Sequence, residues 1–229
     1  MIEKNIIEFS NGCDIKQYYA NESIQNIEGK SNFPFDVLKL YGLCEYQIYY
    51  HKYKKDNKTQ ISESHGRSIQ HQIENIFKQD AEEITLKEAL ELSKTKALMT
   101  RDCFLTSTNY KTHGHVDEIW FNDDEIVLIN DAQGRTPFDS TMLPIKVACL
   151  VFGDEISKTR TVKAALRERG TENLFWIEII TPEIKKDIEN TIKRVHNLLE
   201  NREDYIPTED IKKCRECEFK KPCKYSKVK

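Results

Sequence analysis

The sequence predicts an α/β fold, a mixed central sheet flanked by helices. Three observations support this prediction. Two β-rich runs flank the polar turn at residues 122–125 and indicate a hairpin. Another β-rich run at 174–180 precedes Pro182, a residue that favours the first turn of a helix. Several other segments have the apolar spacing of helices, which would cover the faces of the sheet.

Length and composition suit a single domain over residues 1–229. Hydrophobic residues make up 38% of the chain and charged residues 32%, enough for one core beneath a strongly charged surface. The net charge of -3 excludes a chain that is basic throughout, but residues 211–229 hold eight Lys or Arg against two acids. Such a patch is where a phosphate backbone is expected, although charge alone favours a solvated chain end.

The absence of a leader or membrane segment predicts a cytoplasmic protein. Residues 1–11 carry acids and no long apolar run, and no stretch approaches the ~20 apolar residues that cross a bilayer. We therefore expect no membrane contact. The chain has seven cysteines, and in a reducing compartment clustered cysteines bind metal more often than they form disulfides.

The first half of the chain predicts mainly helices. One helix face is marked by the i, i+3, i+4, i+7 spacing of Tyr46, Tyr49, Tyr50 and Tyr53. This tyrosine stripe could stack on nucleic-acid bases, but a stripe packed on the core with solvated hydroxyls is commoner. Residues 62–100 predict two further helices, one with an apolar stripe from Ile69 to Phe77 and one from Thr85 to Met99.

The second half predicts the sheet. Residues 115–131 form the hairpin, and residues 141–153 are an apolar helix or a buried strand. A strand is expected at 174–180 and a long helix from Pro182 to about Asn201. Residues 205–208 then lead into a cysteine-rich tail.

That tail contains Cys214, Cys217 and Cys223 in a C-x2-C-x5-C pattern. Three thiolates need a fourth ligand for tetrahedral closure, and Cys44 is the best candidate because it begins an aromatic helix. The alternatives are Cys13, Cys103 and Cys149. Four thiolates suit zinc or an iron–sulfur cluster, and zinc is the commoner outcome for a generic site. The distribution predicts a clasp that joins the N-terminal segment 33–60 to the tail 205–229.

The hairpin carries a candidate metal site. Asp117 and Asp131 are equidistant from Asp124, which we interpret as the middle of the turn, so they are expected opposite each other on one face. Gln133 would share that face, and the Ala132 carbonyl would lie between. Paired carboxylates favour Mg²⁺ or Mn²⁺, which can activate water against a phosphate. The alternative is a hairpin with ordinary surface acids.

These features together resemble a known family. An early Cys44 in an aromatic helix, the Asp117 hairpin, the acid-x-polar end at Asp131 and the terminal cysteines are similar to the CRISPR-associated RecB-like exonucleases, the fourth Cas protein. These enzymes belong to the PD-(D/E)XK nuclease superfamily. The resemblance runs from about Phe33 to Cys223. It implies an α/β, RecB-like nuclease core, with a mixed central sheet flanked by helices and a helical iron–sulfur cluster lobe.

The resemblance also implies roles for individual residues. Asp117, Asp131 and the Ala132 carbonyl would bind Mg²⁺ or Mn²⁺, together with a helix histidine that matches His71 most nearly. A surface position for His71 remains the alternative, because it falls opposite the apolar stripe of its helix. The iron–sulfur cluster, a 4Fe-4S cluster in this interpretation, would be held by Cys44, Cys214, Cys217 and Cys223.

The sequence departs from the family pattern at three positions. The family lysine is Gln133 here, and an amide can orient water but supplies no charge. The downstream helix has Lys146 and Leu150 where the family has Gln and Tyr. Lys146 is therefore either a relocated catalytic lysine or a lysine that extends its charge to solvent. Glu45 follows Cys44 where the family has proline.

The expected function is metal-dependent exonuclease cleavage of DNA ends, most often single-stranded in this family. There it trims fragments before they enter a CRISPR array, alongside the integrase proteins. The alternatives are a catalytically weakened iron–sulfur adaptor that binds DNA ends, or a viral or mobile-element nuclease of the same fold outside CRISPR adaptation. A zinc-stabilised structural protein is a third. The sequence leaves open whether the chain forms a homo-oligomer.

Overall fold

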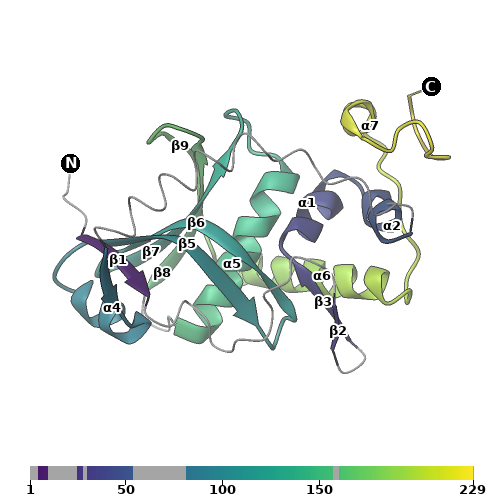
Figure 1. Ribbon diagram of the computed structural model, residues 1–229. Coiled ribbons are helices and arrows are strands. Elements are labelled where there is room, and N and C mark those ends of the chain that lie inside the picture. Colours follow the sequence, from purple (N-terminus) through teal and green to yellow (C-terminus); the bar gives the residue numbers. More distant parts are fainter. Residues whose placement is uncertain (1–4, 10–24, 28–29, 54–80, 157–159, 229) are drawn as a thin grey trace.

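A computed structural model describes the chain in five segments: residues 5–9, 25–27, 30–53, 81–156 and 160–228. The helix predicted around Ile69, the histidine His71 and the alternative ligand Cys13 lie outside these residues. Across the described part, a mixed sheet carries helices against it (Figure 1). The predicted α/β class with a mixed central sheet flanked by helices is therefore confirmed.

The sheet has the order β4-β1-β5-β6-β7-β8-β9, and β3 pairs with both β2 and β6. Strands β5, β6 and β7 are antiparallel neighbours, β8 is parallel to β7, and β9 is antiparallel to β8. The parallel β7–β8 pair requires a crossover, which α5 provides. The strands are β1 Asn5–Phe9, β2 Gln25–Ile27, β3 Lys30–Pro34, β4 Glu82–Ile84, β5 Leu98–Ser107, β6 Thr112–Phe121, β7 Glu125–Ala132, β8 Thr161–Glu168 and β9 Leu174–Ile179.

The helices form two groups. Helix α5 packs on β5, β6, β7 and β8, and α6 packs on α5 and β3. Figure 1 shows α1, α2 and α7 gathered at one side of the molecule, away from β1 and β4. No helix in the described segments has the length and apolar character to cross a membrane. The helices are α1 Asp36–Leu43, α2 Glu45–Tyr53, α4 Leu86–Leu92, α5 Asp139–Ile156, α6 Pro182–Leu199 and α7 Ile211–Glu216.

The elements with strong local signals are confirmed. The hairpin forms as β6 and β7, and the strand at 174–180 followed by a helix from Pro182 forms as β9 and α6. The apolar segment at 141–153 is a helix. Thr181 caps α6 by accepting a hydrogen bond from the Ile184 N–H, with Pro182 in the first turn.

The helix predicted from Thr85 to Met99 is wrong at its C-terminal end. A capping box between Thr85 and Glu88 does start α4, but α4 ends at Leu92 and β5 begins at Leu98. Pairing of β5 with β6 outweighs the helical composition of this segment, since propensity is a weak signal beside tertiary contacts.

The two faces of the sheet differ in their packing. The main core lies under α5 and α6 and includes Ile119 on β6 and Leu128 on β7, both fully buried. Their neighbours in sequence point the other way, and Ile129 joins a smaller cluster with Val127, Ala165 and Trp120. Residues two apart on a strand share a face, so these clusters tell which face each acid of the hairpin occupies.

Helix α1 approaches the first turn of α5 very closely. A Cβ atom built on Gly42 would lie 2.6 Å from the Ser140 backbone nitrogen, closer than real Cβ atoms come. Only glycine fits there without moving backbone. This contact fixes the end of α1, and therefore Cys44, against the start of α5.

We predict that Gly42→Ala destabilises the protein by roughly 1–3 kcal/mol, because overpacking forces the two helices apart. The matched control is Gly153→Ala inside α5, where the added Cβ meets its nearest atom at 3.7 Å. That change is expected to be neutral or to stabilise by up to about 1 kcal/mol, as alanine favours helices. Urea denaturation measures both, and equal stability of the two variants would contradict the close contact.

Candidate functional site

The register of the hairpin differs by one residue from the predicted one. Glu118 pairs with Ile129 and Phe121 with Ile126, so the turn is centred between Asp123 and Asp124. This register places Asp117 across from Asn130 and not across from Asp131. The prediction that Asp117 and Asp131 lie directly opposite each other is therefore wrong, because the two residues are offset by one position when this register is continued.

Asp117 nevertheless contacts the end of β7. Its Oδ2 accepts a hydrogen bond from the Asp131 backbone N–H at 2.7 Å, and its own N–H donates to Asn130 Oδ1 at 3.2 Å. The carboxylate of Asp117 therefore contacts the backbone of Asp131, the second acid of the predicted site. The two residues are therefore neighbours at the end of the hairpin.

Asp131 belongs to a buried charge network that sequence reasoning missed. Arg167 of β8 is directly in register with Asp131, and its Nε lies 2.7 Å from Asp131 Oδ1. The same guanidinium places Nη1 at 3.0 Å from Glu118 Oε2. Arg101 of β5 lies on the other side of Glu118, with Nη2 at 2.8 Å. One residue from each of β5, β6, β7 and β8 thus joins a chain of ion pairs that runs Arg101, Glu118, Arg167, Asp131.

Glu118 is the centre of this network. Its side chain is only 2% exposed, and the Trp120 indole N–H donates to its other oxygen. Burial alone would raise the pKa of Glu118, but Arg167, the Trp120 indole and Arg101 together lower it below its ordinary value. Glu118 is therefore a charged group that the surrounding cations hold ionised.

Two further predicted site residues have other roles in this structure. The Ala132 carbonyl accepts a hydrogen bond from the Arg169 N–H at 3.0 Å, so it points toward β8 in the plane of the sheet. The interpretation of that carbonyl as a metal ligand is not supported by this orientation. Gln133 follows the end of β7 and is exposed, so its amide is accessible to solvent.

Lys146 does not approach the hairpin acids. Its Nζ lies 2.5 Å from Glu178 Oε2 on β9 and 5.5 Å from the centre of the Trp176 ring. Glu178 lies on β9, which is two strands away from β7. The hypothesis that Lys146 replaces the family lysine has no support in this arrangement, because the ion pair holds its charge at β9.

As arranged, the hairpin provides an incomplete site for a divalent cation. Within the described segments, no three His, Cys, Asp or Glu side chains are grouped to hold a metal ion. Asp117 and Asp131 supply two carboxylates in adjacent positions, but Arg167 already neutralises the second. A fitting site needs Asp131 to turn from Arg167, and it needs another ligand such as His71, which lies outside the described residues.

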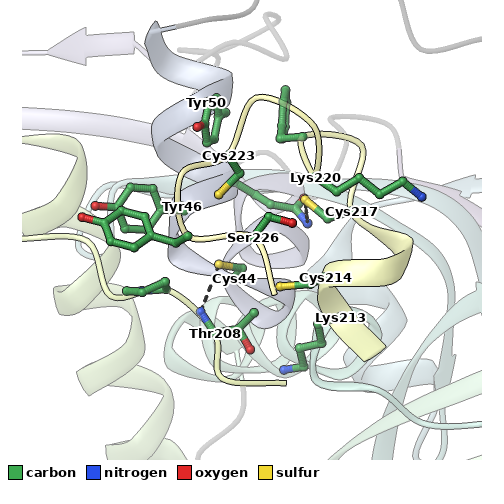
Figure 2. Close-up of a pocket in the computed structure, with 14 residues that line it drawn as sticks. Cys44, Tyr46, Tyr50, Thr208, Lys213, Cys214, Cys217, Lys220, Cys223 and Ser226 are labelled. Carbon is green, nitrogen blue, oxygen red and sulfur yellow. Dashed lines mark hydrogen bonds between the residues drawn. The ribbon is translucent and has the colours of Figure 1, made fainter. Parts of the chain in front are cut away.

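The four thiols of the predicted clasp line one pocket. The sulfurs of Cys44, Cys214, Cys217 and Cys223 face the same space in Figure 2, inside a pocket also lined by tyrosines of α2. Burial raises the pKa of the Cys217 thiol, and the other three cysteines raise it further. Their charges therefore act on one another, as expected for thiols that surround one centre.

Two N–H groups are directed at these sulfurs. The Thr208 backbone N–H donates to Cys44 Sγ at 3.3 Å, and Gln47 Nε2 donates to Cys217 Sγ at 3.6 Å. Such hydrogen bonds stabilise thiolates, which are the form that ligates metal. By the chemistry of its donors, the pocket suits an iron–sulfur cluster or zinc, but in the described segments these four thiols are not grouped as a formed metal site either. Cys103 and Cys149 are buried elsewhere, on β5 and α5.

The tail is held on α1 and α2 by contacts independent of the thiols. Glu45 stands where the family has proline. Its Oε2 lies 2.6 Å from Arg194 Nη2 on α6 and accepts a hydrogen bond from the Ile206 N–H at 2.7 Å. Lys213 Nζ donates to the Gly42 carbonyl at 2.8 Å. Segments 30–53 and 205–228 therefore meet along a broad surface, and Glu45 has a structural reason to be charged.

The tyrosine stripe packs against the same tail. The ring of Tyr46 lies 4.5 Å from that of Tyr225, and Tyr49 lies 5.6 Å from Tyr205. Tyr50 stacks on Phe219 and donates to the Pro222 carbonyl at 3.0 Å. These contacts support the interpretation of the stripe as a packing surface with partly solvated hydroxyls.

Comparisons with known proteins find likeness to solved structures. No protein-family model matches this chain, and no curated protein matches its sequence. Among the solved structures that match is one titled "Crystal structure of SSO0001", with a TM-score of 0.47 and 13% sequence identity. The match covers 90% of this chain and 90% of that chain.

We predict that Glu118→Gln costs about 1.5–3 kcal/mol of stability, because Arg167 and Arg101 lose the buried carboxylate that they share and Arg167 keeps only Asp131. The control is Glu125→Gln, whose partner Lys163 is 26% exposed, and we expect a change within about 1 kcal/mol. Denaturation curves at neutral pH measure both.

The pH dependence provides a second test of the same network. Since the pKa of Glu118 is lowered in the folded state, its stabilising contribution is complete above the unfolded value near 4.5. It is lost as the pH falls through the lower folded value. The stability difference between wild type and Glu118→Gln should therefore shrink below about pH 4.5, and a constant difference would contradict the network.

Proposed function

We propose that this chain is a metal-dependent DNA nuclease of the RecB-like type that acts on DNA ends, single-stranded in preference. In this proposal it processes fragments for CRISPR spacer acquisition, with DNA and the CRISPR integrase proteins as partners. Support comes from the order of the motifs along the chain and from the mixed sheet on which the hairpin lies. The observation that carries the proposal is the 2.7 Å contact between Asp117 and the Asp131 backbone at the end of β7.

The proposed metal ligands are Asp117 and Asp131, together with His71. When bound, Mg²⁺ or Mn²⁺ would supply an activated water and neutralise charge on the scissile phosphate. The role of this chain is to bring the two carboxylates to the end of the hairpin. Asp131 must exchange Arg167 for the cation, since a carboxylate paired with a guanidinium is already neutralised.

Gln133 is proposed to orient the attacking water. It lies two residues after Asp131, beyond the end of β7, and its exposed amide can both donate and accept hydrogen bonds. It supplies no positive charge, so the family lysine has no direct substitute in this proposal. Lys146 takes no part, because Glu178 binds it.

The clasp is proposed to hold a 4Fe-4S cluster through Cys44, Cys214, Cys217 and Cys223. Its role is architectural, since it joins the end of α1 to the tail. The start of α5, which follows the hairpin by a few residues, packs on α1 at Gly42. Through α5, the clasp therefore supports the end of β7 where the two acids meet.

A second candidate function is favoured by the pairing of Asp131 with Arg167. If that ion pair persists in the presence of metal, the chain would bind DNA ends without cutting them, as an iron–sulfur adaptor. A third reading is a viral or mobile-element nuclease with the same chemistry, and the neighbouring genes distinguish it from a CRISPR nuclease.

The nuclease proposal predicts that wild-type protein with Mn²⁺ degrades labelled single-stranded DNA from its ends. Asp117→Ala and Asp131→Ala should lose at least about 100-fold in rate, because each removes a metal ligand. Gln133→Ala should lose less, since it only orients water. Lys146→Ala is the matched control from α5 and should keep near-wild-type activity. Products are separated on a denaturing gel.

Each alternative has its own result in this assay. Wild-type protein that binds the DNA but leaves it uncut, with its metal centre intact, would establish the adaptor and refute the nuclease. A large loss in Lys146→Ala with unchanged stability would instead restore the relocated lysine. Activity that survives in Asp117→Ala would remove the hairpin from the mechanism.

The clasp proposal predicts about four iron and four sulfide per chain and visible colour in anaerobically purified protein. Cys44→Ser and Cys217→Ser should lose both, with a lower unfolding temperature because ligand binding is linked to folding. Cys103→Ala, on β5 and outside the pocket, should keep the full metal content. A colourless protein with one zinc per chain would overturn the cluster and keep the clasp.

A further inference from the structure

We propose that Arg167 is an internal counter-cation that competes with the divalent metal for Asp131 and so sets the metal concentration at which the site fills. This inference rests on the proposed function, since it assumes that Asp131 is a metal ligand. Arg167 is then a positioning residue for Asp131. No motif in the sequence pointed to it, and it lies on β8, outside the hairpin.

The geometry gives Arg167 two acids to hold at once. Its Nε contacts Asp131 at 2.7 Å and its Nη1 contacts Glu118 at 3.0 Å. The guanidinium is a planar fork with donors in fixed directions, which suits it to bridging two carboxylates. The side chain is 8% exposed, so it is a fixed part of the sheet and too buried to reach a phosphate of bound DNA.

The contact with Glu118 allows Asp131 to exchange Arg167 for a metal ion. If Asp131 turns toward a metal ion, Arg167 remains paired with Glu118, so its charge is never buried without a partner. Removing a partner from a buried charge is otherwise strongly unfavourable. Arg101 also binds Glu118, at 2.8 Å, and holds that carboxylate in place from the other side. Glu118 is therefore an anchor, and Asp131 is the acid that can change partners.

Exposure of Glu118, Arg167 and Asp131 agrees with this division. Glu118 is 2% exposed and Arg167 8%, whereas Asp131 is 20% exposed at the end of its strand. A metal ion arriving from solvent therefore meets Asp131 first. Its binding must displace a guanidinium from Asp131, which lowers the apparent metal affinity by the strength of that ion pair.

The test measures Mn²⁺ affinity directly, from the electron paramagnetic resonance signal of unbound Mn²⁺ in a titration. Arg167→Gln should bind Mn²⁺ about tenfold more tightly than wild type, which corresponds to ~1.4 kcal/mol. The matched control is Arg101→Gln, which removes the same charge from the same network but has no contact with Asp131. Its affinity should stay within about twofold of wild type.

Arg167→Lys provides the same test if Arg167→Gln does not fold. Lysine keeps the charge but is a point donor that cannot bridge both acids, so Mn²⁺ binding should tighten by a smaller factor. Unchanged affinity in both Arg167 variants would overturn the inference, as would an equal gain in Arg101→Gln, which would indicate a general charge effect. Wild type that binds no more Mn²⁺ than Asp117→Ala would instead refute the proposed metal site itself.

Discussion

The arrangement of β6, β7 and β8 is tied to the bridge that Arg167 makes between Glu118 and Asp131. It exists only if β7 lies between β6 and β8 in the observed register, with Glu118 beside Ile129 and Asp131 beside Arg167. The β8 strand reaches that position through the α5 crossover, so the helix that buries one face also delivers the arginine to the other. A buried ion network of this kind tolerates little displacement, because each charge needs its partner.

The second group of constraints acts through α1 and α5. Gly42 allows the end of α1 to touch the first turn of α5, and Lys213 of the tail binds the Gly42 carbonyl and lies 3.7 Å from Asp139 Oδ2 at the start of α5. The thiol pocket and the hairpin acids are therefore connected by one helix and its neighbour. Disturbance of the tail is therefore transmitted toward the sheet through this contact.

Sequence patterns were sufficient where the signal was local. The hairpin, the strand before Pro182 and its helix follow from β-rich runs, turn residues and a proline that favours a first helical turn, and the tyrosine stripe follows from helical spacing. The β8 strand could not be predicted, because its Ala, Leu, Arg and Glu residues favour helices and only its neighbours on both sides make it a strand. The register of the hairpin was one residue off, because four polar residues do not mark the centre of their turn. Arg167 of β8 contacts Glu118 of β6 past the intervening β7, and no local sequence pattern predicts such a contact.

The distance along the chain between the parts of the clasp has a consequence for biosynthesis. Gln47 and Cys217, which meet beside the thiols, are 170 residues apart in sequence. At ordinary rates of translation, roughly 10–35 s pass between their synthesis. During that interval Cys44 is in a nascent chain whose other three thiols do not yet exist, so whatever the pocket holds must be loaded after the tail emerges from the ribosome. The body of the sheet can fold earlier, and maturation of the pocket is then limited by synthesis of the segment that carries Cys214, Cys217 and Cys223.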